Sequence, residues 1–294
     1  MRGLVIGGSG YLGARLVRAL GPRGLATHRT PHAPDQVAFD AEKMRLSDLL
    51  PQLPGDLTHV FAPYGAINPE AIARDPARFA AINVAGMIGV LKDALDAGLK
   101  PVFFSTDYVF DGAHGGWTEE DAPRPLTAYG AQKLAVEAWL ATVGAPWLTV
   151  RLSKLVSGDR DTHSVLGQWV NDFFEGRPQR CAADQIFSPT FVDDAAGAVV
   201  ALCDAGAQGL FHVAAPEALS RLDLLNLLYD AARAHRDDLV IEITPCRLHD
   251  LNFAEKRPLN TALSSEKLRR TIDWRFTPMA ALCAEVAAAH FAAK

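Results

Sequence analysis

A glycine-rich loop at residues 7–13 constrains the fold of this chain most strongly. It follows a short apolar run, Leu4 to Ile6, and precedes a stretch with apolar residues at helical spacing. The loop fits G-x-x-G-x-x-G and also G-x-G-x-x-G. Glycines between a strand and a helix let the backbone approach a pyrophosphate, which then lies against the helix N-terminus. A purely structural turn is the alternative. We therefore predict a dinucleotide site that includes Gly7, Gly10, Tyr11, Leu12 and Gly13.

The order of apolar segments predicts the fold class. In the first half of the chain, short apolar runs alternate with longer helical patterns, which is typical of βαβ units and a parallel sheet. After about residue 153 this alternation weakens. We predict an α/β protein with a doubly wound parallel sheet (Rossmann fold) and a smaller, discontinuous C-terminal α/β domain. The predicted NAD(P)-binding domain spans 1–154 with a return segment at about 187–213, and the predicted substrate-binding domain spans 155–186 and 214–294.

The end of the second predicted strand indicates the cofactor. Enzymes that use NAD place an acidic residue there to hold the ribose 2′-hydroxyl. This chain has His28-Arg29-Thr30 instead. An arginine suits a 2′-phosphate, so NADP(H) is favoured over NAD(H). Asp40 ends the third predicted strand, and we expect its carboxylate to accept a hydrogen bond from the adenine amino group.

Tyr129 and Lys133 form a Y-x-x-x-K pair, and this spacing puts both side chains on one face of a helix. A free tyrosine titrates near ~10, and a nearby ammonium lowers that pKa by stabilising the phenolate. Tyr129 can then donate a proton to a carbonyl oxygen, while Lys133 also holds the nicotinamide ribose. Thr106 follows the fifth predicted strand, where ligands of parallel sheets bind, and its hydroxyl can polarise the same carbonyl. We predict these three residues to be catalytic.

Composition excludes several other classes. The net charge of -5 argues against broad nucleic-acid binding, and no apolar run reaches the ~18 residues that a membrane span needs. The nine histidines show no ligand spacing, so we predict no metal. The cysteines form no C-x-x-C pair, which predicts free thiols and a reducing, cytoplasmic location. They are Cys181, Cys203, Cys246 and Cys283. We expect a small-molecule substrate, no nucleic acid and no membrane.

Together these motifs resemble an extended short-chain dehydrogenase/reductase, and most closely the dTDP-4-dehydrorhamnose reductase family. The segment 104–112, F-S-T-D-Y-V-F-D-G, resembles that family's signature around the catalytic threonine, and 129–133, Y-G-A-Q-K, resembles its catalytic helix. Later in the chain, D-Q at 184–185 with S-P-T at 188–190 resembles its D-Q-x-G-x-P-T segment, and R-P-L-N at 257–260 its R-P-x-N segment. The resemblance extends over residues 7–268.

The resemblance implies NADPH-dependent reduction of a 4-keto nucleotide sugar, with Thr106, Tyr129 and Lys133 as catalytic residues. It also implies that Asn83 lies near the cofactor and that Arg257 lies near the substrate. Members of the superfamily often pair through helices near the catalytic tyrosine, so a homodimer is expected from the resemblance.

Two departures bear on the substrate. Ser153-Lys154 stands where the family has S-W, and residues 63–70 lack a hydroxyl and an acid of the family pattern. We therefore predict that Lys154 and Arg257 bind substrate, with an anionic substrate as a hypothesis. Two other functions stay open. One is an NAD-dependent nucleotide-sugar epimerase or dehydratase. The other is a non-catalytic, dinucleotide-binding regulatory subunit, like the β-subunit of methionine adenosyltransferase, which resembles the same family.

Overall fold

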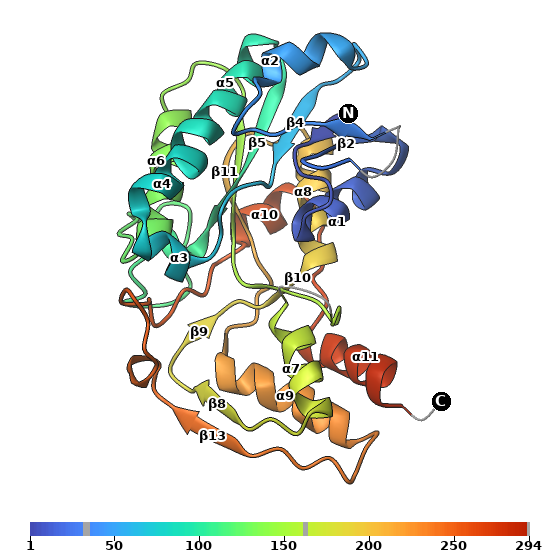
Figure 1. Cartoon of the computed structure of the whole chain (residues 1–294), viewed down its shortest axis with the longest axis vertical. Coiled ribbons are helices and arrows are strands. Elements are labelled where there is room, and N and C mark those ends of the chain that lie inside the picture. The colour runs from blue at the N-terminus through green and yellow to red at the C-terminus, as the bar shows by residue number, and fades with distance from the viewer. Residues whose placement is uncertain (32–35, 161–163, 293–294) are drawn as a thin grey trace.

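The computed structural model describes residues 1–31, 36–160 and 164–292, and its main feature is a parallel sheet of seven strands (Figure 1). The strand order is β11-β6-β5-β4-β1-β2-β3. Because the order reverses between β1 and β4, the sheet has the switch point at which such folds bind ligands. The predicted doubly wound α/β fold is therefore confirmed. The strands are β1 (Gly3–Val5), β2 (Gly24–His28), β3 (Val37–Ala38), β4 (His59–Ala62), β5 (Lys100–Thr106), β6 (Leu148–Leu152) and β11 (Gly209–Val213).

Helices cover both faces of this sheet. On one face α1 packs against α8, and on the other α5 and α6 pack against β5 (Figure 1). The buried side chains between these layers are almost all aliphatic or aromatic, which gives the sheet its core. The helices are α1 (Tyr11–Leu20), α2 (Leu46–Leu49), α3 (Pro69–Arg74), α4 (Pro76–Ala80), α5 (Met87–Asp96), α6 (Ala128–Leu140), α8 (Val192–Asp204) and α10 (Glu266–Thr271). Short 3-10 turns occur at Gly21–Arg23, Leu50–Gln52, Asp107–Val109 and Leu248–Asp250.

A long helical stretch at residues 76–96 is interrupted in the structure. It consists of α4, a π-helical turn at Ala81–Gly86, and α5. At its start the Asp75 side chain accepts a hydrogen bond from the backbone N–H of Arg78, and just past its end Gly98 has a positive φ of 72°. A π turn inserts one extra residue into the helix and is common at functional sites. Here it contains Asn83, whose side chain is hydrogen-bonded outside the helix.

The second half of the chain adds a smaller group of elements with a core of its own, in the lower part of Figure 1. Three helices pack around buried residues such as Trp169, Leu228 and Cys283. They are α7 (Val165–Phe174), α9 (Arg221–Arg233) and α11 (Met279–Phe291). Three short strand pairs accompany them: β8 (Gln179–Ala182) with β13 (Ile243–Cys246), β9 (Ile186–Phe187) with β12 (Leu219–Ser220), and β7 (Leu155–Val156) with β10 (Thr190–Phe191). The predicted domain boundaries stay a prediction.

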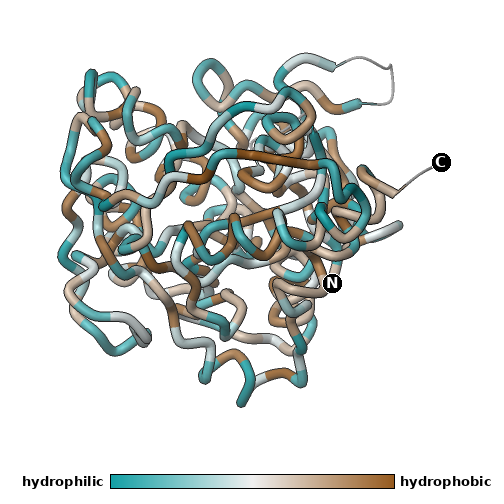
Figure 2. Tube along the Cα trace, turned by 90° about the horizontal axis from the view of Figure 1, so that it is seen from below, coloured by the Kyte–Doolittle hydropathy of each residue, from teal (hydrophilic) through white to brown (hydrophobic). Residues whose placement is uncertain are grey.

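Apolar segments of the trace run through the middle of the molecule, and many of the loops at its outer margin are hydrophilic (Figure 2). The four cysteines are free thiols, as predicted, and three of them are buried. Trp117 is also buried and stacks on Phe110, so it belongs to the core. No helix in the described part of the chain is long and apolar enough to cross a membrane.

Candidate active site

The glycine loop between β1 and α1 has the geometry of a phosphate cradle. Gly7 has a positive φ of 80°, which favours glycine. At Gly13, a Cβ atom would lie 2.2 Å from the carbonyl oxygen of Gly7, so no side chain fits there. Gly10 is the N-cap of α1 and offers no side chain to its first-turn N–H groups, and this turn carries no acidic residue. A dinucleotide pyrophosphate therefore fits this helix start both sterically and electrostatically.

Beside the cradle, Tyr64 follows β4 and packs near Gly7. A Cβ atom added to Gly7 would lie 3.6 Å from the Cβ atom of Tyr64. Its hydroxyl is buried and has no hydrogen-bond partner among the described residues. Burial raises the pKa of this phenol, so it stays neutral. A buried hydroxyl without a partner is a further sign that this space receives a polar ligand. Sequence reasoning did not assign Tyr64 to the site.

At the outer end of the cradle, the structure brings Arg29 and Asp40 together. Nε of Arg29 lies 3.4 Å from Oδ2 of Asp40, and Nη2 lies 3.2 Å from Oε1 of Glu42. The Arg29 side chain is 66% exposed. A ribose 2′-phosphate at Arg29 would therefore share the guanidinium with two carboxylates. The second carboxylate, Glu42, was not among the predicted residues.

Asn83 is 2% exposed and connects the π turn to the loop after β4. Its Oδ1 accepts from the backbone N–H of Ala66 at 2.8 Å, and its Nδ2 donates to the carbonyl of Ala66 and to Oε1 of Gln132. The neighbouring Gly65 has a φ of 129°. A Cβ atom added to Gly65 would lie only 3.0 Å from Oδ1 of Asn83. Asn83 thus fixes the loop that faces the glycine cradle across the switch point.

Thr106 and Tyr129 meet at the carboxyl end of β5. The Thr106 hydroxyl accepts from the backbone N–H of Tyr108 at 3.2 Å, donates to Oδ1 of Asp107 at 3.0 Å, and also interacts with the Tyr129 hydroxyl. Tyr129 stands in the first turn of α6, whose N-cap Thr127 accepts from the N–H of Gly130. A Cβ atom on Gly130 would lie 2.1 Å from the carbonyl oxygen of Tyr108, so the absence of a side chain lets α6 approach this turn.

The electrostatics of the tyrosine–lysine pair differ from the prediction. Burial and the Asp107 carboxylate raise the pKa of Tyr129, and the opposing influence comes from Thr106 rather than from Lys133. The Lys133 ammonium instead donates to the carbonyl oxygen of Phe104 at 2.9 Å. Burial lowers the pKa of Lys133 to about 8. The expected lowering of the phenol pKa by Lys133 is therefore wrong for this state of the protein, because that ammonium is held by the backbone of β5.

Asp107 is a site residue that sequence reasoning missed. Its carboxylate is 5% exposed and accepts hydrogen bonds from the hydroxyls of Thr261 at 2.6 Å, Thr106 at 3.0 Å and Ser153 at 3.3 Å. Burial nevertheless raises its pKa to about 6. The signal available in the sequence was its position between Thr106 and Tyr108, in the segment that resembles the family signature.

A buried ion pair between Glu137 and Arg151 anchors α6, the helix that carries Tyr129 and Lys133. Glu137 lies one turn after Lys133 and accepts from Nε and Nη2 of Arg151 at 3.1 and 2.7 Å. The hydroxyl of Ser105 donates to the same carboxylate. The Glu137 carboxylate also raises the pKa of Lys133, against the larger effect of burial. This network ties α6 to β5 and β6, the two strands that end at the site.

On the substrate side, Arg257 is not a free cation. Its guanidinium forms an ion pair with Glu70 at the start of α3, and the Glu70 carboxylate also accepts from the backbone N–H of Ala254 at 2.9 Å. Arg257 lies over the ring of Tyr108, 5.8 Å from its centroid, which brings it to the edge of the catalytic group. The role of Arg257 as a substrate ligand stays a prediction, and the structure adds that Glu70 balances its charge.

Lys154 lies at the same end of the sheet, directly after β6. Its side chain is solvent-exposed, yet surrounding protein atoms lower its pKa, as expected for an ammonium that lines a cleft. The charges that act on it are those of Arg221 and Arg257, which lower its pKa, and Asp107, which raises it. Lys154 thus stays a candidate substrate ligand.

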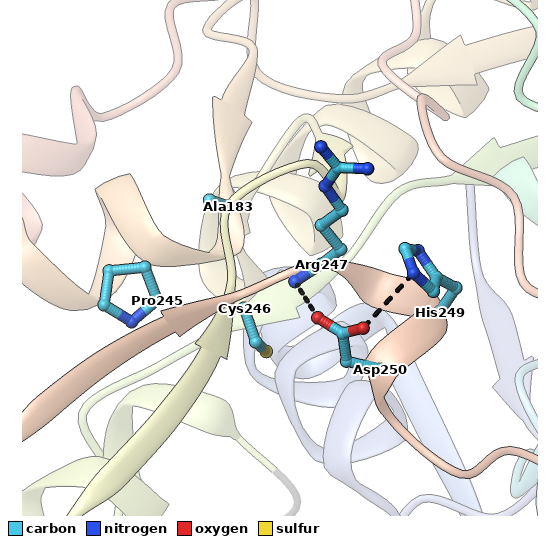
Figure 3. A pocket seen from close by; sticks show the side chains of 6 residues that line it. All are labelled: Ala183, Pro245, Cys246, Arg247, His249 and Asp250. Atoms are coloured by element: carbon cyan, nitrogen blue, oxygen red, sulfur yellow. Dashed lines mark hydrogen bonds and ion pairs between the residues drawn. The ribbon is translucent and has the colours of Figure 1, made fainter.

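A groove of about 730 Å³ extends outward from Arg257. Its lining includes Phe253, Lys256 and Leu259, so it is partly apolar and partly cationic. A second hollow, of about 550 Å³, lies at the carboxyl ends of β8 and β13. There Asp250 contacts His249 and the backbone of Arg247, whose guanidinium points away from it (Figure 3). Arg257, which lines the first groove, lies over Tyr108, and Tyr108 contacts the ring of Tyr129, so this groove lies on the side of the predicted catalytic residues.

The family assignment rests on a match over almost the whole chain. Residues 1–289 match the family model described as RmlD substrate binding domain. The chain belongs to this family. The predicted class, an NAD(P)-dependent oxidoreductase of the extended short-chain dehydrogenase/reductase superfamily, is confirmed with it.

Individual relatives agree with the family. A protein of Haloferax volcanii named "Probable low-salt glycan biosynthesis reductase Agl14" is 31% identical, over 76% of this chain and 77% of its own length. The dTDP-4-dehydrorhamnose reductase of Escherichia coli strain K12 is 26% identical over 92% of this chain and 94% of its own. The methionine adenosyltransferase 2 subunit beta of Danio rerio is 28% identical over 68% of this chain and 62% of its own length.

Solved structures show the same fold. The dTDP-4-dehydrorhamnose reductase of Bacillus anthracis in complex with NADP has a TM-score of 0.83, covers 99% of this chain and 98% of its own, and is 21% identical. At that identity the likeness concerns the fold, which agrees with the strand order of the sheet.

Proposed function

We propose that this protein is an NADPH-dependent reductase of a carbonyl group on a nucleotide-sugar substrate. One observation carries the proposal: the hydroxyls of Thr106 and Tyr129 meet at the carboxyl end of β5, on the same edge of the sheet as the glycine cradle after β1. The family and the relatives named dTDP-4-dehydrorhamnose reductase support it. NADP in the related Bacillus anthracis structure supports the cofactor.

The proposed cofactor site uses Gly7, Gly10, Tyr11, Leu12 and Gly13 for the pyrophosphate. Arg29 would hold the 2′-phosphate, Asp40 the adenine, and Asn83 would fix the loop opposite the cradle. Lys133 would bind the nicotinamide ribose. The Lys133 ammonium already donates a hydrogen bond to the Phe104 carbonyl, which holds it in place. A ribose hydroxyl would accept a second hydrogen bond from the same ammonium.

The chemistry follows from the two hydroxyls. NADPH supplies a hydride when it is bound. Tyr129 is a neutral phenol near pH 7 and therefore carries the proton that the carbonyl oxygen would receive, although its raised pKa makes it a weaker acid than a free tyrosine. Thr106 would hold the same oxygen, because its hydroxyl lies beside that of Tyr129. Tyr129 would thus donate its proton to that oxygen while Thr106 holds it in place.

The proposed substrate site lies between the catalytic residues and the groove beside Arg257. Lys154 and Arg257 border it from β6 and from the 253–257 segment. Arg257 acts there with Glu70 as a neutralised pair, which suits hydrogen bonding to a substrate better than it suits net charge attraction. Nucleotide sugars with and without a carboxylate therefore distinguish whether this site binds an anionic sugar.

One observation favours a second function, that of an epimerase or dehydratase with tightly bound NAD. Asp40 and Glu42 place carboxylates beside Arg29, near the expected ribose, and acids in this region suit an unphosphorylated 2′-hydroxyl. A regulatory role finds support in the relative from Danio rerio, but it leaves the assembled pair Thr106 and Tyr129 without a use.

The experiment has two steps. Purified protein is first titrated with NADPH and NADH by fluorescence, and we expect at least tenfold tighter binding of NADPH, about 1.4 kcal/mol. NADPH oxidation is then followed with 4-keto nucleotide sugars, including dTDP-4-dehydrorhamnose. Co-purified NAD would indicate the epimerase or dehydratase, and binding of neither nucleotide would indicate a structural glycine loop.

The second step includes a matched pair of variants. Tyr129→Phe removes the proposed proton donor, so we expect NADPH binding to persist and turnover to fall at least 100-fold. Tyr229→Phe makes the same chemical change on α9, where the hydroxyl contacts only the backbone of residues 239 and 241, and should keep normal turnover. Full turnover of Tyr129→Phe would refute the proposed mechanism.

A further inference from the structure

Two cations from distant parts of the chain act on each other beside the catalytic residues. Lys154 follows β6, and Arg221 is the first residue of α9. Both residues border the 185–190 segment, because the backbone N–H of Thr190 donates to the carbonyl of Lys154 and that of Arg221 donates to the carbonyl of Gln185, each at 2.9 Å. The charge of Arg221 also lowers the pKa of Lys154. Arg151 and Arg257 are ion-paired with Glu137 and Glu70, whereas Lys154 and Arg221 form no ion pair with any described residue.

Lys154 lies at the reaction end of the cleft. Thr106 is in register with Leu152 in the parallel pair of β5 and β6, and Lys154 is two residues further along. Since β6 ends at Leu152, Lys154 lies just beyond the strand end that is in register with Thr106. The ammonium of Lys154 also acts on Asp107, the neighbour of Thr106. A group bound by Lys154 would therefore belong to the part of the substrate that carries the carbonyl.

Arg221 is held in a fixed place. Its guanidinium lies over the ring of Trp169, 5.3 Å from the centroid, and Trp169 is buried in the smaller core. Its backbone N–H donates to the carbonyl of Gln185 at 2.9 Å. Two cations that repel each other on rigid supports lose that repulsion when an anion binds between them. The arrangement therefore favours an anionic ligand over a neutral one.

We propose that Lys154 and Arg221 bind a carboxylate on the carbonyl-bearing sugar, so that the substrate is a nucleotide-linked keto sugar acid. The inference rests on the proposed function and narrows its substrate class. A diphosphate is the other anion of such a substrate, but the lysine and arginines that line the outward groove are Arg247, Lys256 and Arg257, and Lys154 does not line it. The diphosphate would thus lie further out, and the carboxylate beside Lys154.

The test compares two ligands that differ in one substituent. Binding of UDP-glucuronate and UDP-glucose to the full chain with NADP⁺ is measured by calorimetry, and the dTDP forms are measured likewise. We expect at least tenfold tighter binding of the glucuronate in one of the two pairs. In Lys154→Met and Arg221→Met, this ratio should fall below about threefold while binding of the glucose ligand changes little. Lys256→Met removes a cation from the groove and should keep the ratio.

Each other outcome overturns the proposal. A ratio near one in the unaltered protein would exclude the carboxylate site. Equal weakening of both ligands by Lys154→Met would show that Lys154 binds the diphosphate, which both ligands carry. Binding of neither pair would exclude this ligand class. If Lys154→Met does not fold, Lys154→Arg should keep the ratio and Lys154→Gln should lose it. Failure of the proposed function would give a different result. No keto sugar would support NADPH oxidation, although UDP- or dTDP-glucuronate would still bind at least tenfold more tightly than the matching glucose ligand.

Discussion

Substitution of Gly13 by alanine tests whether the glycine loop is built for close approach. The added Cβ atom would lie 2.2 Å from the carbonyl oxygen of Gly7, 3.0 Å from its carbonyl carbon and 3.2 Å from Cα of Gly8. All three atoms belong to the backbone, so no side chain can move away. Since a carbon–oxygen contact needs about 3.2 Å, α1 and the loop must separate by roughly 1 Å, and overpacking of this kind costs about 1–3 kcal/mol.

The same displacement would open the phosphate cradle. The N–H groups at the start of α1 and the loop would no longer converge on one pyrophosphate, because the extra Cβ atom stands between them. We expect NADPH affinity to fall at least tenfold, which is about 1.4 kcal/mol, in addition to the lost stability. Affinity is measured by NADPH fluorescence and the free energy of unfolding by urea titration.

Gly89→Ala is the matched control. Gly89 lies inside α5 with nothing within 4 Å of a Cβ atom, and its φ is not in the left-handed region. Alanine is favoured over glycine in a helix by about 1 kcal/mol, so this variant should be slightly more stable and bind NADPH normally. If Gly13→Ala also keeps its stability and its NADPH affinity, the reasoning about the loop is refuted.

Three further changes test other parts of the site. Glu137→Gln leaves the buried Arg151 without its carboxylate and should lower the free energy of unfolding by about 3–5 kcal/mol. The double variant Glu137→Leu/Arg151→Met removes both charges and should lose much less stability. Equal losses in the two variants would contradict the ion-pair explanation. Arg29→Ala should weaken NADPH binding about tenfold with little effect on NADH, and a parallel loss for both would exclude contact with the 2′-phosphate. Asp107 has a pKa raised from its ordinary 3.8 to about 6, so the folded state holds its proton more tightly than the unfolded state does. From pH 4 to pH 6 the protein should therefore lose about 2 kcal/mol of stability relative to Asp107→Asn, as urea unfolding at pH 4 and pH 7 would show, and a constant difference would argue against the raised pKa.

Local sequence patterns predicted the elements that carry the cofactor site. The glycine loop stands between β1 and α1, and the Y-x-x-x-K pair lies on α6 as its spacing required. These features depend on residues a few positions apart, so a single sequence shows them. Even here the interior of the helix over residues 76–97 was not predictable, because its π turn depends on bonds from Asn83 to Ala66 and Gln132.

The substrate side was harder to predict because distant residues assemble it. Thr261 reaches Asp107, Glu255 accepts from the N–H of Ala128 at the start of α6, and Arg257 pairs with Glu70. Each contact joins residues more than a hundred positions apart. Arg257 stays a predicted substrate ligand, and only the fold shows that the Glu70 carboxylate balances its charge.

Burial shifts the ionisable groups at the reaction centre toward their neutral forms. It raises the pKa of Asp107 from its ordinary 3.8 to about 6, and it lowers the pKa of Lys133 from its ordinary 10.5 to about 8. Near pH 7 both groups therefore stand close to their midpoints, where gaining or losing a proton costs little free energy. Tyr129, which lies between them in the chain, stays a neutral phenol. A buried site that holds a neutral phenol, with two groups near it whose pKa values burial moves toward neutrality, fits the proposed proton transfer to a carbonyl oxygen better than it fits binding alone.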